Sequence, residues 1–426
     1  MLDIKFIKEN LEICKQAAIN KNRTVDWDKL LRLDEDRRRL IQKSGVLREE
    51  RNKVSQQRTA DSQHLKGKEI RLNLKKVDED LRNVEKEFNE LMYTVPNVPD
   101  PSVPIGKDSS GNVEIKKWGE IRLFDFPQKD HIQLAKELDL IDFERGAKVG
   151  GYRGYFLKNA AAQLEFAVLF FTFQKLINKG YIPLIAPSLV KEFTLFGNGQ
   201  FPWGKEEVYQ LNKDQMYLAG TAEVPVTAYF SDEILNEKDL PKKFVAFSPC
   251  FRREAGSYGK DTKGVYRLHQ FSKIEQVIIS DNVMAHSFSL HEELLQNAEE
   301  VLKDLKLPYR VLLMCTGDMG EPQVKKYDIE TWIPCRLGPG DRGLGNYGET
   351  MSNSVMGDFQ ARRLRIRYKT KNGKTLFCHT LNNTAVASPR ILIPILENYQ
   401  NADGSITIPQ VLQPYIGKDK IVKKPL

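Results

Sequence analysis

One stretch of the chain, from Lys68 to Tyr93, carries a hydrophobic repeat that restricts it to a long helix. Its apolar residues lie alternately four and three positions apart: Ile70, Leu74, Val77, Leu81, Val84, Phe88 and Leu91. This spacing keeps one apolar stripe on a single side of an α-helix, which is the seam of a coiled coil. The stripe therefore requires a second helix to cover it.

The segment upstream supplies a partner helix whose seam is only half apolar. Leucine or valine recurs every seven residues, at Leu33, Leu40, Leu47 and Val54, whereas the alternate seam positions are Arg37, Ser44, Arg51 and Arg58. A polar stretch with one glycine, TADSQHLKG at 59–67, separates the two helices and is expected to form the turn. The pattern predicts an antiparallel helical arm over about 27–93, with two helices of about 30 residues and a length of roughly 45 Å.

The function of such an arm is left open by its pattern. A dimerisation coiled coil, a spacer or a nucleic-acid-binding arm would all show the same seam. The formal net charge of +8 suits a polyanionic partner without proving one. The candidates for phosphate contacts are basic residues near the turn: Arg51, Arg58, His64, Lys66 and Lys68.

Residues 96–112 are rich in Pro, Gly, Ser and Asp, so the sequence predicts an N-terminal domain at 1–95, a linker, and a second domain at 113–426. The second domain shows many strands with few helices between them, which favours an α+β fold with an antiparallel sheet. We expect strands at 243–254, 271–280, 309–318, 327–335 and 358–368, a helix and turn at 131–149, a buried helix ending at Gly180, and an amphipathic helix at 282–307.

Several classes of protein and site are disfavoured. The five cysteines are scattered without a CxxC pair, and the six histidines include no HExxH, so no structural zinc is expected. The first residues do not resemble a signal peptide, and no uninterrupted apolar run reaches the roughly 18–20 residues of a membrane span. We expect a cytoplasmic protein without a membrane partner. The nucleotide-binding patterns GxxxxGK[ST] and GxGxxG are absent.

Two arginine-containing elements remain as candidates for chemistry. FRREAGSYGKDTKGVYRLHQF, at 251–271, is expected to be a strand, a Gly-rich basic loop and a second strand. A guanidinium on a rigid strand can hold a phosphate through two hydrogen bonds. HTLNNTAVASPRILIPILENYQ, at 379–400, places Pro389 and Arg390 before an apolar helix, with Pro389 expected in its first turn. Taken separately, each element could also be purely structural.

Together with their neighbours, these elements resemble the seryl-tRNA synthetases, a class II aminoacyl-tRNA synthetase family. The likeness covers nearly the whole chain: GYIPLIAPSLV at 180–190 is similar to motif 1, 251–275 to motif 2, and the helical pair to the tRNA-binding arm. Further family signatures follow in the same order: LAGTAEVP, CTGDMG, DFQARR and HTLN…R…ILENYQ…DGSI.

The resemblance implies an ATP-dependent enzyme that forms seryl-adenylate, releases pyrophosphate, and transfers serine to tRNA(Ser), with tRNA(Sec) left open as a second acceptor. It implies catalytic roles for Arg252, Arg390 and Glu349, and a magnesium site at Glu349 and Ser352. The implied ATP contacts are Arg252, Arg253, Glu254, Leu268, Phe271, Glu349, Thr350, Met351, Ser352 and Arg390. The implied serine contacts are Thr221, Ala222, Glu223, Arg252, Glu275 and Thr384. The family also implies a homodimer.

The strand ETMSNSVMGDFQARR, at 349–363, departs from the family pattern Glu-x-Ser-Ser-Cys-Ser-Asn. Val355 stands in place of the familiar asparagine, and Asn353 is the expected substitute for its hydrogen bond. Two other classes of protein would differ from this sequence in identifiable features. A paralogue that loads a carrier protein would lack the helical arm, which is present here. A scaffold with an inactive synthetase fold is favoured by loss of Arg252, Arg390 or Glu349, and all three are retained.

Overall fold

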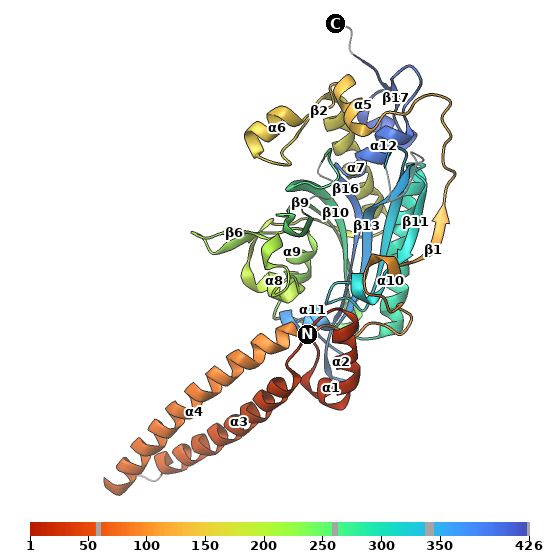
Figure 1. The fold of residues 1–426 in the computed structure, drawn as a ribbon. Coiled ribbons are helices and arrows are strands. Elements are labelled where there is room, and N and C mark those ends of the chain that lie inside the picture. Colours follow the sequence, from red (N-terminus) through yellow and green to blue (C-terminus); the bar gives the residue numbers. More distant parts are fainter. Residues whose placement is uncertain (57–60, 258–262, 337–344, 424–426) are drawn as a thin grey trace. The chain divides into compact units, whose positions relative to one another are not determined.

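The structure is a computed structural model that describes residues 1–56, 61–257, 263–336 and 345–423 (Figure 1). The chain divides into two compact units, Met1–Val98 and Pro99–Leu426. The helices of the first unit are α1 (Ile4–Glu9), α2 (Leu11–Asn20), α3 (Trp27–Gln56) and α4 (Asp61–Thr94).

The predicted helical hairpin is confirmed by α3 and α4, which pack along their length in Figure 1. The apolar stripe of α4 is buried at Ile70, Leu74 and Val77. The polar seam positions of α3 also face α4. Ser44 donates a hydrogen bond to Asp78 across the pair at 2.8 Å, and the Arg37 guanidinium lies 4.8 Å from the centre of the Phe88 ring.

The turn predicted at 59–67 is mostly helical, because α4 already begins at Asp61. Polar residues are compatible with an exposed helix, and the expected stop signal, Gly67, costs only about 1 kcal/mol within a helix. A side chain at Gly67 would meet Val54 at 3.7 Å, so the glycine also lies against the partner helix. Residues 57–60 lie outside the described part of the chain.

The second unit is built on an eight-stranded sheet in the order β1-β11-β12-β13-β16-β10-β9-β4. All neighbouring strands in it are antiparallel except β4 and β9, so the predicted α+β fold is confirmed. Its strands are β1 (Val113–Trp118), β4 (Ile182–Ile185), β9 (Lys242–Phe251), β10 (Gln270–Ser280), β11 (Tyr309–Leu313), β12 (Lys325–Ile333), β13 (Asn346–Gly357) and β16 (His379–Ser388).

In the described part of this unit, shorter strands form four small sheets outside the large one. They are β2 (Ile141–Asp142), β3 (Phe156–Leu157), β5 (Leu189–Lys191), β6 (Tyr209–Leu211), β7 (Met216–Leu218), β8 (Ile234–Asn236), β14 (Arg367–Lys369), β15 (Thr375–Phe377), β17 (Ile406–Thr407) and β18 (Lys420–Ile421). The helices of this unit are α5 (His131–Glu137), α6 (Phe143–Gly150), α7 (Asn159–Asn178), α8 (Glu192–Asn198), α9 (Glu223–Thr227), α10 (Met284–Asp304), α11 (Phe359–Leu364), α12 (Leu392–Asn398) and α13 (Gln413–Ile416).

Alternation along the central strands separates a packed face of the sheet from a polar face. On β10, Gln276 donates to the Leu294 carbonyl of α10, and on β13, Asn353 donates to the His291 carbonyl of the same helix. The neighbouring positions Glu275 and Ser352 point to the opposite face and line a cavity there. The amphipathic helix predicted at 282–307 is thus α10, which covers the packed face.

Three sequence-based expectations about this unit need correction. The strand expected at 358–368 is instead the short helix α11 followed by β14, because Gln360, Ala361 and Leu364 are buried at the three- and four-residue spacing of a helix. The helix and turn expected at 131–149 are two helices, α5 and α6, joined through β2. Pro389 precedes the apolar helix α12 rather than opening its first turn, since α12 begins at Leu392.

Among the described residues, one helix, α7, is long and apolar enough to cross a membrane when judged by length and composition alone. It ends as predicted, with Gly180 following it at φ 88°. Its buried side chains, including Leu164 and Val168, pack in the main core with residues of β9, β10 and β16. The helix therefore has the position of a core helix of the second unit.

Candidate active site

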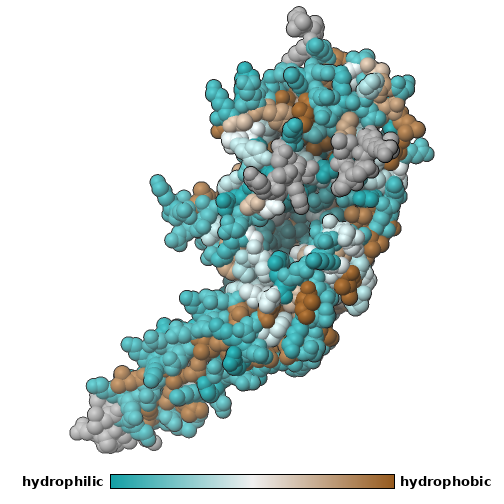
Figure 2. Space-filling model, in the orientation of Figure 1, coloured by the Kyte–Doolittle hydropathy of each residue, from teal (hydrophilic) through white to brown (hydrophobic). Residues whose placement is uncertain are grey.

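A cavity of about 250 Å³ opens on the polar face of the large sheet. A hollow with mostly hydrophilic walls can be followed on the face shown in Figure 2. The predicted residues that line the cavity come from β9, β10, β13, β16 and the segments beside them: Thr221, Glu223, Arg252, Glu254, Leu268, Phe271, Glu275, Glu349, Thr350, Met351, Ser352, Thr384 and Arg390. Positions separated by up to 169 residues in the sequence thus meet at one site.

Arg252 directly follows β9 and is fixed from two sides. Its Nε donates to the Gly220 carbonyl at 3.2 Å, and its guanidinium lies 5.2 Å from the centre of the Phe271 ring on β10. A guanidinium held against a ring keeps its remaining N–H groups available for an anion in the cavity. Glu254, two residues further along the chain, has a backbone φ of 54°. Residues other than glycine rarely adopt this conformation, and those that do are concentrated at functional sites.

Arg390 provides a second guanidinium from the turn after β16. Its Nε donates to the Tyr266 carbonyl at 3.0 Å, and its Nη1 donates to the Glu349 carbonyl at 3.1 Å and lies 3.5 Å from a Glu349 carboxylate oxygen. Burial acts to raise the pKa of Glu349, but Arg390, followed by Lys326 and Arg252, holds that pKa below its ordinary value. Glu349 is therefore an anion in a strongly cationic site.

A second group of polar residues meets around the buried ammonium of Lys273. This ammonium donates to Thr221 Oγ1 at 2.7 Å and to Thr384 Oγ1 at 3.3 Å, and it forms an ion pair with Glu275. The Glu275 carboxylate also accepts from Asn382 at 3.3 Å and from Thr384 at 3.4 Å. Lys273 and Glu275 are two positions apart on β10, so they share one face of the strand.

Glu223 stands at the start of α9, beside this group. Its carboxylate accepts from Gln360 at 2.8 Å, and its backbone N–H donates to Thr221 Oγ1 at 3.2 Å. Burial, followed by the nearby Glu275 carboxylate, raises the pKa of Glu223 to about 7. Two carboxylates and two hydroxyls thus lie beside the Lys273 ammonium on the cavity wall, where they can contact a small molecule that carries an ammonium and a hydroxyl group.

The structure does not bring two of the predicted residues into the cavity. Arg253 points outward, with 47% of its side chain exposed and an ion pair to Glu206 at 3.5 Å. Ala222 is buried in an apolar cluster with Phe244 and Ala246. Of the residues that do line the cavity, Thr350 bonds to Thr331 and Met351 lies in the main core, so both contribute walls rather than free polar groups.

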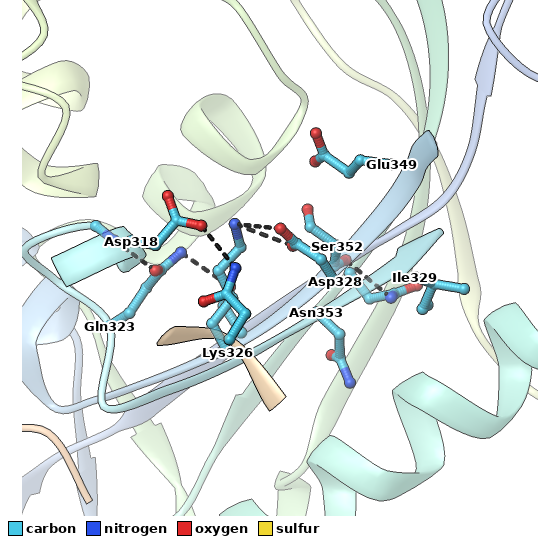
Figure 3. Close-up of polar contacts among 12 residues, drawn as sticks. Asp318, Gln323, Lys326, Asp328, Ile329, Glu349, Ser352 and Asn353 are labelled. Atoms are coloured by element: carbon cyan, nitrogen blue, oxygen red, sulfur yellow. Dashed lines mark hydrogen bonds and ion pairs between the residues drawn. The ribbon is translucent and has the colours of Figure 1, made fainter. Parts of the chain in front are cut away.

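The expectation that Asn353 replaces a lost hydrogen bond in the site is wrong. Figure 3 shows its side chain directed away from the side of β13 on which Ser352 lies, and it donates to the His291 carbonyl of α10. Adjacent residues of a strand point to opposite faces, so Ser352 and Asn353 cannot both reach the cavity. The amide that contacts Glu275 comes instead from Asn382 on β16.

Sequence reasoning also missed several residues of the cavity wall: Gln200, Tyr266, Lys273, Gln323, Lys326, Ser354 and Asn382. Lys273 could have been found, because it shares a strand face with Glu275. Lys326 lies on β12, where the Asp328 carboxylate holds its ammonium at 3.0 and 3.1 Å. Its place in the cavity depends on the pairing of β12 with β13, which the sequence does not reveal.

The donor set suits a hard divalent cation only in part. Glu349 and Ser352 offer carboxylate and hydroxyl oxygens on one wall, which are ligands that Mg²⁺ accepts. Within the described ranges, no three His, Cys, Asp or Glu residues form a metal-binding group. Mg²⁺ is commonly held by one or two carboxylates together with phosphate oxygens and water. The residues therefore fit a metal that is shared with a phosphate-bearing ligand.

Of the predicted arm residues, Arg51, Lys66 and Lys68 are exposed on α3 and α4. Arg58 and the side chain of His64 lie outside the described part of the chain. The exposed positions carry three positive charges near the end of the hairpin. Their roles remain a prediction.

Comparison with known proteins identifies the family. The seryl-tRNA synthetase N-terminal domain model matches residues 1–99, and the class II tRNA synthetase core domain model (G, H, P, S and T) matches residues 206–399. The serine–tRNA ligase of Deinococcus radiodurans is 44% identical over 432 residues, covering 100% of both chains. The chain belongs to the seryl-tRNA synthetase family.

Solved structures agree with this family assignment. Seryl-tRNA synthetase from Pyrococcus horikoshii, complexed with ATP, matches with a TM-score of 0.90 and 38% identity over 100% of both chains. The cytoplasmic serine–tRNA ligase of Naegleria fowleri, in complex with AMP, matches with a TM-score of 0.87 and 31% identity, covering 100% of this chain and 99% of the other. In both comparisons the likeness spans the first unit and the second unit of this chain.

Proposed function

We propose that this chain activates serine with ATP, releases pyrophosphate, and transfers the seryl group to tRNA(Ser). The observation that carries the proposal is the meeting of two guanidiniums and a Lys273–Glu275 group in one cavity. The first part suits a polyphosphate and the second suits a small hydroxylated amino acid. Family membership supports the same reading, and tRNA(Sec) remains a second acceptor to be tested.

We propose that positioning and charge neutralisation drive the first step. The serine carboxylate attacks the α-phosphate, so two anions must approach each other. Arg252 would bridge these anions, Arg390 would hold the γ-phosphate, and Phe271 would stack on adenine while Glu254 accepts from its amino group. Glu349 and Ser352 would hold Mg²⁺, which when bound neutralises phosphate charge. The cationic side chains would also stabilise the negative charge that develops on the departing pyrophosphate.

We propose that Glu275 accepts the serine hydroxyl, with Thr384 beside it, and that Thr221 and Glu223 receive the amino group. An amino acid without the hydroxyl would leave the buried Glu275 oxygens without that partner, which is a strong basis for rejecting alanine. The side chains of Arg253 and Ala222 lie off the cavity, so neither side chain is placed to contact ATP or serine. These two residues would have to act through the backbone.

The proposed reaction is tested by ATP–pyrophosphate exchange with each of the twenty amino acids. Serine should stimulate exchange, and alanine should stimulate it at least about a thousandfold less, as expected for a site built to hydrogen-bond a hydroxyl. Exchange stimulated by another amino acid and not by serine would reject the assigned specificity. The same preparation tests whether the chain is instead a carrier-protein ligase. When tRNA is supplied, serine should become acid-precipitable, whereas a carrier-protein ligase would leave the tRNA uncharged.

Serine use should depend on pH through Glu223. Its pKa is raised to about 7, so the carboxyl is neutral below that pH and charged above it. Only the charged form attracts the ammonium of serine, so kcat/KM for serine should fall about tenfold per pH unit below 7 and level off above it. Exchange kinetics between pH 6 and 8 measure this. Glu223→Gln should give a low, flat profile, whereas an unchanged slope would assign the titration to another group.

We propose that the chain forms a homodimer through α7 and β4. Exposed apolar residues gather on these elements: Phe166 is 78% exposed, Phe170 54% and Ile185 82%. Large apolar surfaces of this kind mark protein interfaces. Within the described residues, β4 is also an edge strand of the large sheet, a position at which another chain can pair. Sedimentation equilibrium should give twice the chain mass, and Phe166→Glu should shift it toward the monomer.

We further propose that the first unit binds tRNA through its arm and that the protein acts in the cytoplasm, where tRNA is charged. All five cysteines are free thiols, consistent with a reducing compartment. The seam of α3 and α4 leaves the basic residues near the hairpin end on the surface, where they can contact phosphates. Fractionation of cells expressing a tagged chain tests the location.

A further inference from the structure

Lys326, which lines the cavity, forms an ion pair with Asp328 two positions along β12. The ammonium lies 3.0 and 3.1 Å from the two carboxylate oxygens. Figure 3 shows it beside Asp328, which lies next to Ser352 of β13. Only 16% of the Lys326 side chain and 10% of the Asp328 side chain are exposed. The pair is thus held in a fixed place at the edge of the cavity.

The pairing of β12 with β13 places this ion pair beside the proposed metal ligands. Asp328 lies directly opposite Ser352, and Lys326 lies directly opposite Ser354. In antiparallel strands, the side chains of such pairs are close neighbours on one face. The Asp328 carboxylate therefore has the position of a further oxygen ligand beside Ser352 and Glu349, but an ammonium already lies against both of its oxygens.

We propose that Lys326 is an internal counter-cation that keeps Asp328 from binding a divalent ion, so that the metal enters this pocket together with the nucleotide. The inference rests on the proposed function, because Glu349 and Ser352 are metal ligands only in that reading. Without Asp328 these two residues offer too few oxygens for an ion that requires about six. The phosphates of a bound nucleotide would supply the remainder.

The positive charge of Lys326 affects both the stability of the pocket and its affinity for metal. Its charge neutralises a carboxylate that would otherwise be buried without a partner, which stabilises the pocket before any ligand arrives. The same charge repels a second cation at close range, which lowers the affinity of the empty pocket for metal. Lys326 is thus a positioning residue that acts through Asp328.

The test is divalent-ion binding to the full-length protein without nucleotide, with Mn²⁺ as the probe followed by electron paramagnetic resonance. The native chain should bind Mn²⁺ weakly. Lys326→Met should bind one Mn²⁺ per chain with at least about tenfold higher affinity, because one neighbouring positive charge is gone. Its Tm should be lower than that of the native chain in EDTA and should rise with added Mg²⁺, whereas the native Tm should hardly change.

Two further variants show whether the effect passes through Asp328. Lys326→Met combined with Asp328→Asn should lose the new Mn²⁺ affinity, because the uncovered carboxylate is gone. Lys325→Met is the matched control: Lys325 is the adjacent lysine on β12, and its ammonium lies over the Phe288 and Tyr327 rings, 5.6 and 5.2 Å from their centres. This variant should bind Mn²⁺ as the native chain does.

Equal Mn²⁺ affinity in the native chain and Lys326→Met would overturn the proposal, as would tight binding that survives in the double variant. If Lys326→Met does not fold, the native chain alone decides: tight Mn²⁺ binding without nucleotide overturns the inference, and tight binding that appears only with added ATP supports it. Serine-dependent exchange by the native chain is measured separately. Its absence would reject the proposed function, whereas the metal measurements bear on Lys326.

Discussion

Replacing Arg252 by alanine is expected to reduce serine-dependent ATP–pyrophosphate exchange by about a thousandfold, which corresponds to about 4 kcal/mol of transition-state stabilisation. The expected cause is the loss of the cation between the serine carboxylate and the α-phosphate. Phe271 and the Gly220 carbonyl fix the Arg252 guanidinium in the free chain, so little ordering is required when the substrates bind. The loss should therefore appear mainly in kcat.

Arg253→Ala is the matched control for this experiment. Arg253 is the next residue, carries the same charge, and points outward to Glu206 rather than into the cavity. Its replacement should change exchange by less than about threefold, since an exposed ion pair contributes little. Circular dichroism should show that both variants are folded. Equal losses in the two variants would indicate that the general charge of this segment, and not the position of Arg252, controls the reaction.

Shortening the helical arm should separate the two halves of the reaction. Replacing residues 48–73 with a short Gly-Ser turn removes the outer part of α3 and α4 but keeps the Ser44–Asp78 hydrogen bond. It also keeps the core at the base of the arm, where Leu30, Leu33 and Phe88 are buried. Exchange should stay within about twofold of the native rate, whereas kcat/KM for tRNA should fall at least about a hundredfold as phosphate contacts are lost.

A milder variant supports the same conclusion. Charge reversal at the exposed residues Lys66 and Lys68 should weaken tRNA charging and reduce its dependence on salt, while exchange remains at the native level. A matched reversal at Lys15, a half-buried residue of α2 paired to Glu12 at 2.8 Å, should have little effect on either activity. Loss of exchange together with charging in the shortened arm would contradict a separate tRNA-holding role for α3 and α4.

The sequence predicted the parts of this molecule whose signals are local. The arm follows from a seven-residue repeat, and its helices form wherever that repeat runs. Motif 2 follows from a strand, a loop and a strand within 30 residues, so Arg252, Glu254 and Phe271 could be assigned to one site before any contact was known. The family resemblance added the more distant partners, such as Arg390, which no local pattern brings to the same cavity.

The sequence did not predict features that depend on strand pairing. β13 has one extra residue, Thr350, where Ile329 pairs with Met351 and Glu330 pairs with Glu349. This bulge lets Glu349 line the cavity together with Ser352, although simple alternation places them on opposite faces. The same register sets Asp328 opposite Ser352, and no spacing within either strand indicates that neighbourhood.

For Asn353, the alternation of side chains along a strand would have given the right answer, whereas the expectation drawn from the family pattern was wrong. The side chains of Ser352 and Ser354 face the cavity, so alternation alone requires Asn353 to face α10, as it does. Arg253 points outward for a similar reason, because the side chain of its neighbour Arg252 points into the cavity. A family motif assigns a residue to a segment, but the direction of its side chain is set by the backbone.

A structure of the chain with a non-hydrolysable ATP analogue and serine tests the central claim most directly. The claim is that two fixed guanidiniums hold the triphosphate so that serine, bound by Glu275, faces the α-phosphate. The predicted result places the Arg252 guanidinium within hydrogen-bond distance of an α-phosphate oxygen, Arg390 on the γ-phosphate, and the serine hydroxyl on Glu275. Nucleotide bound elsewhere, with both guanidiniums turned away from the phosphates, would contradict it.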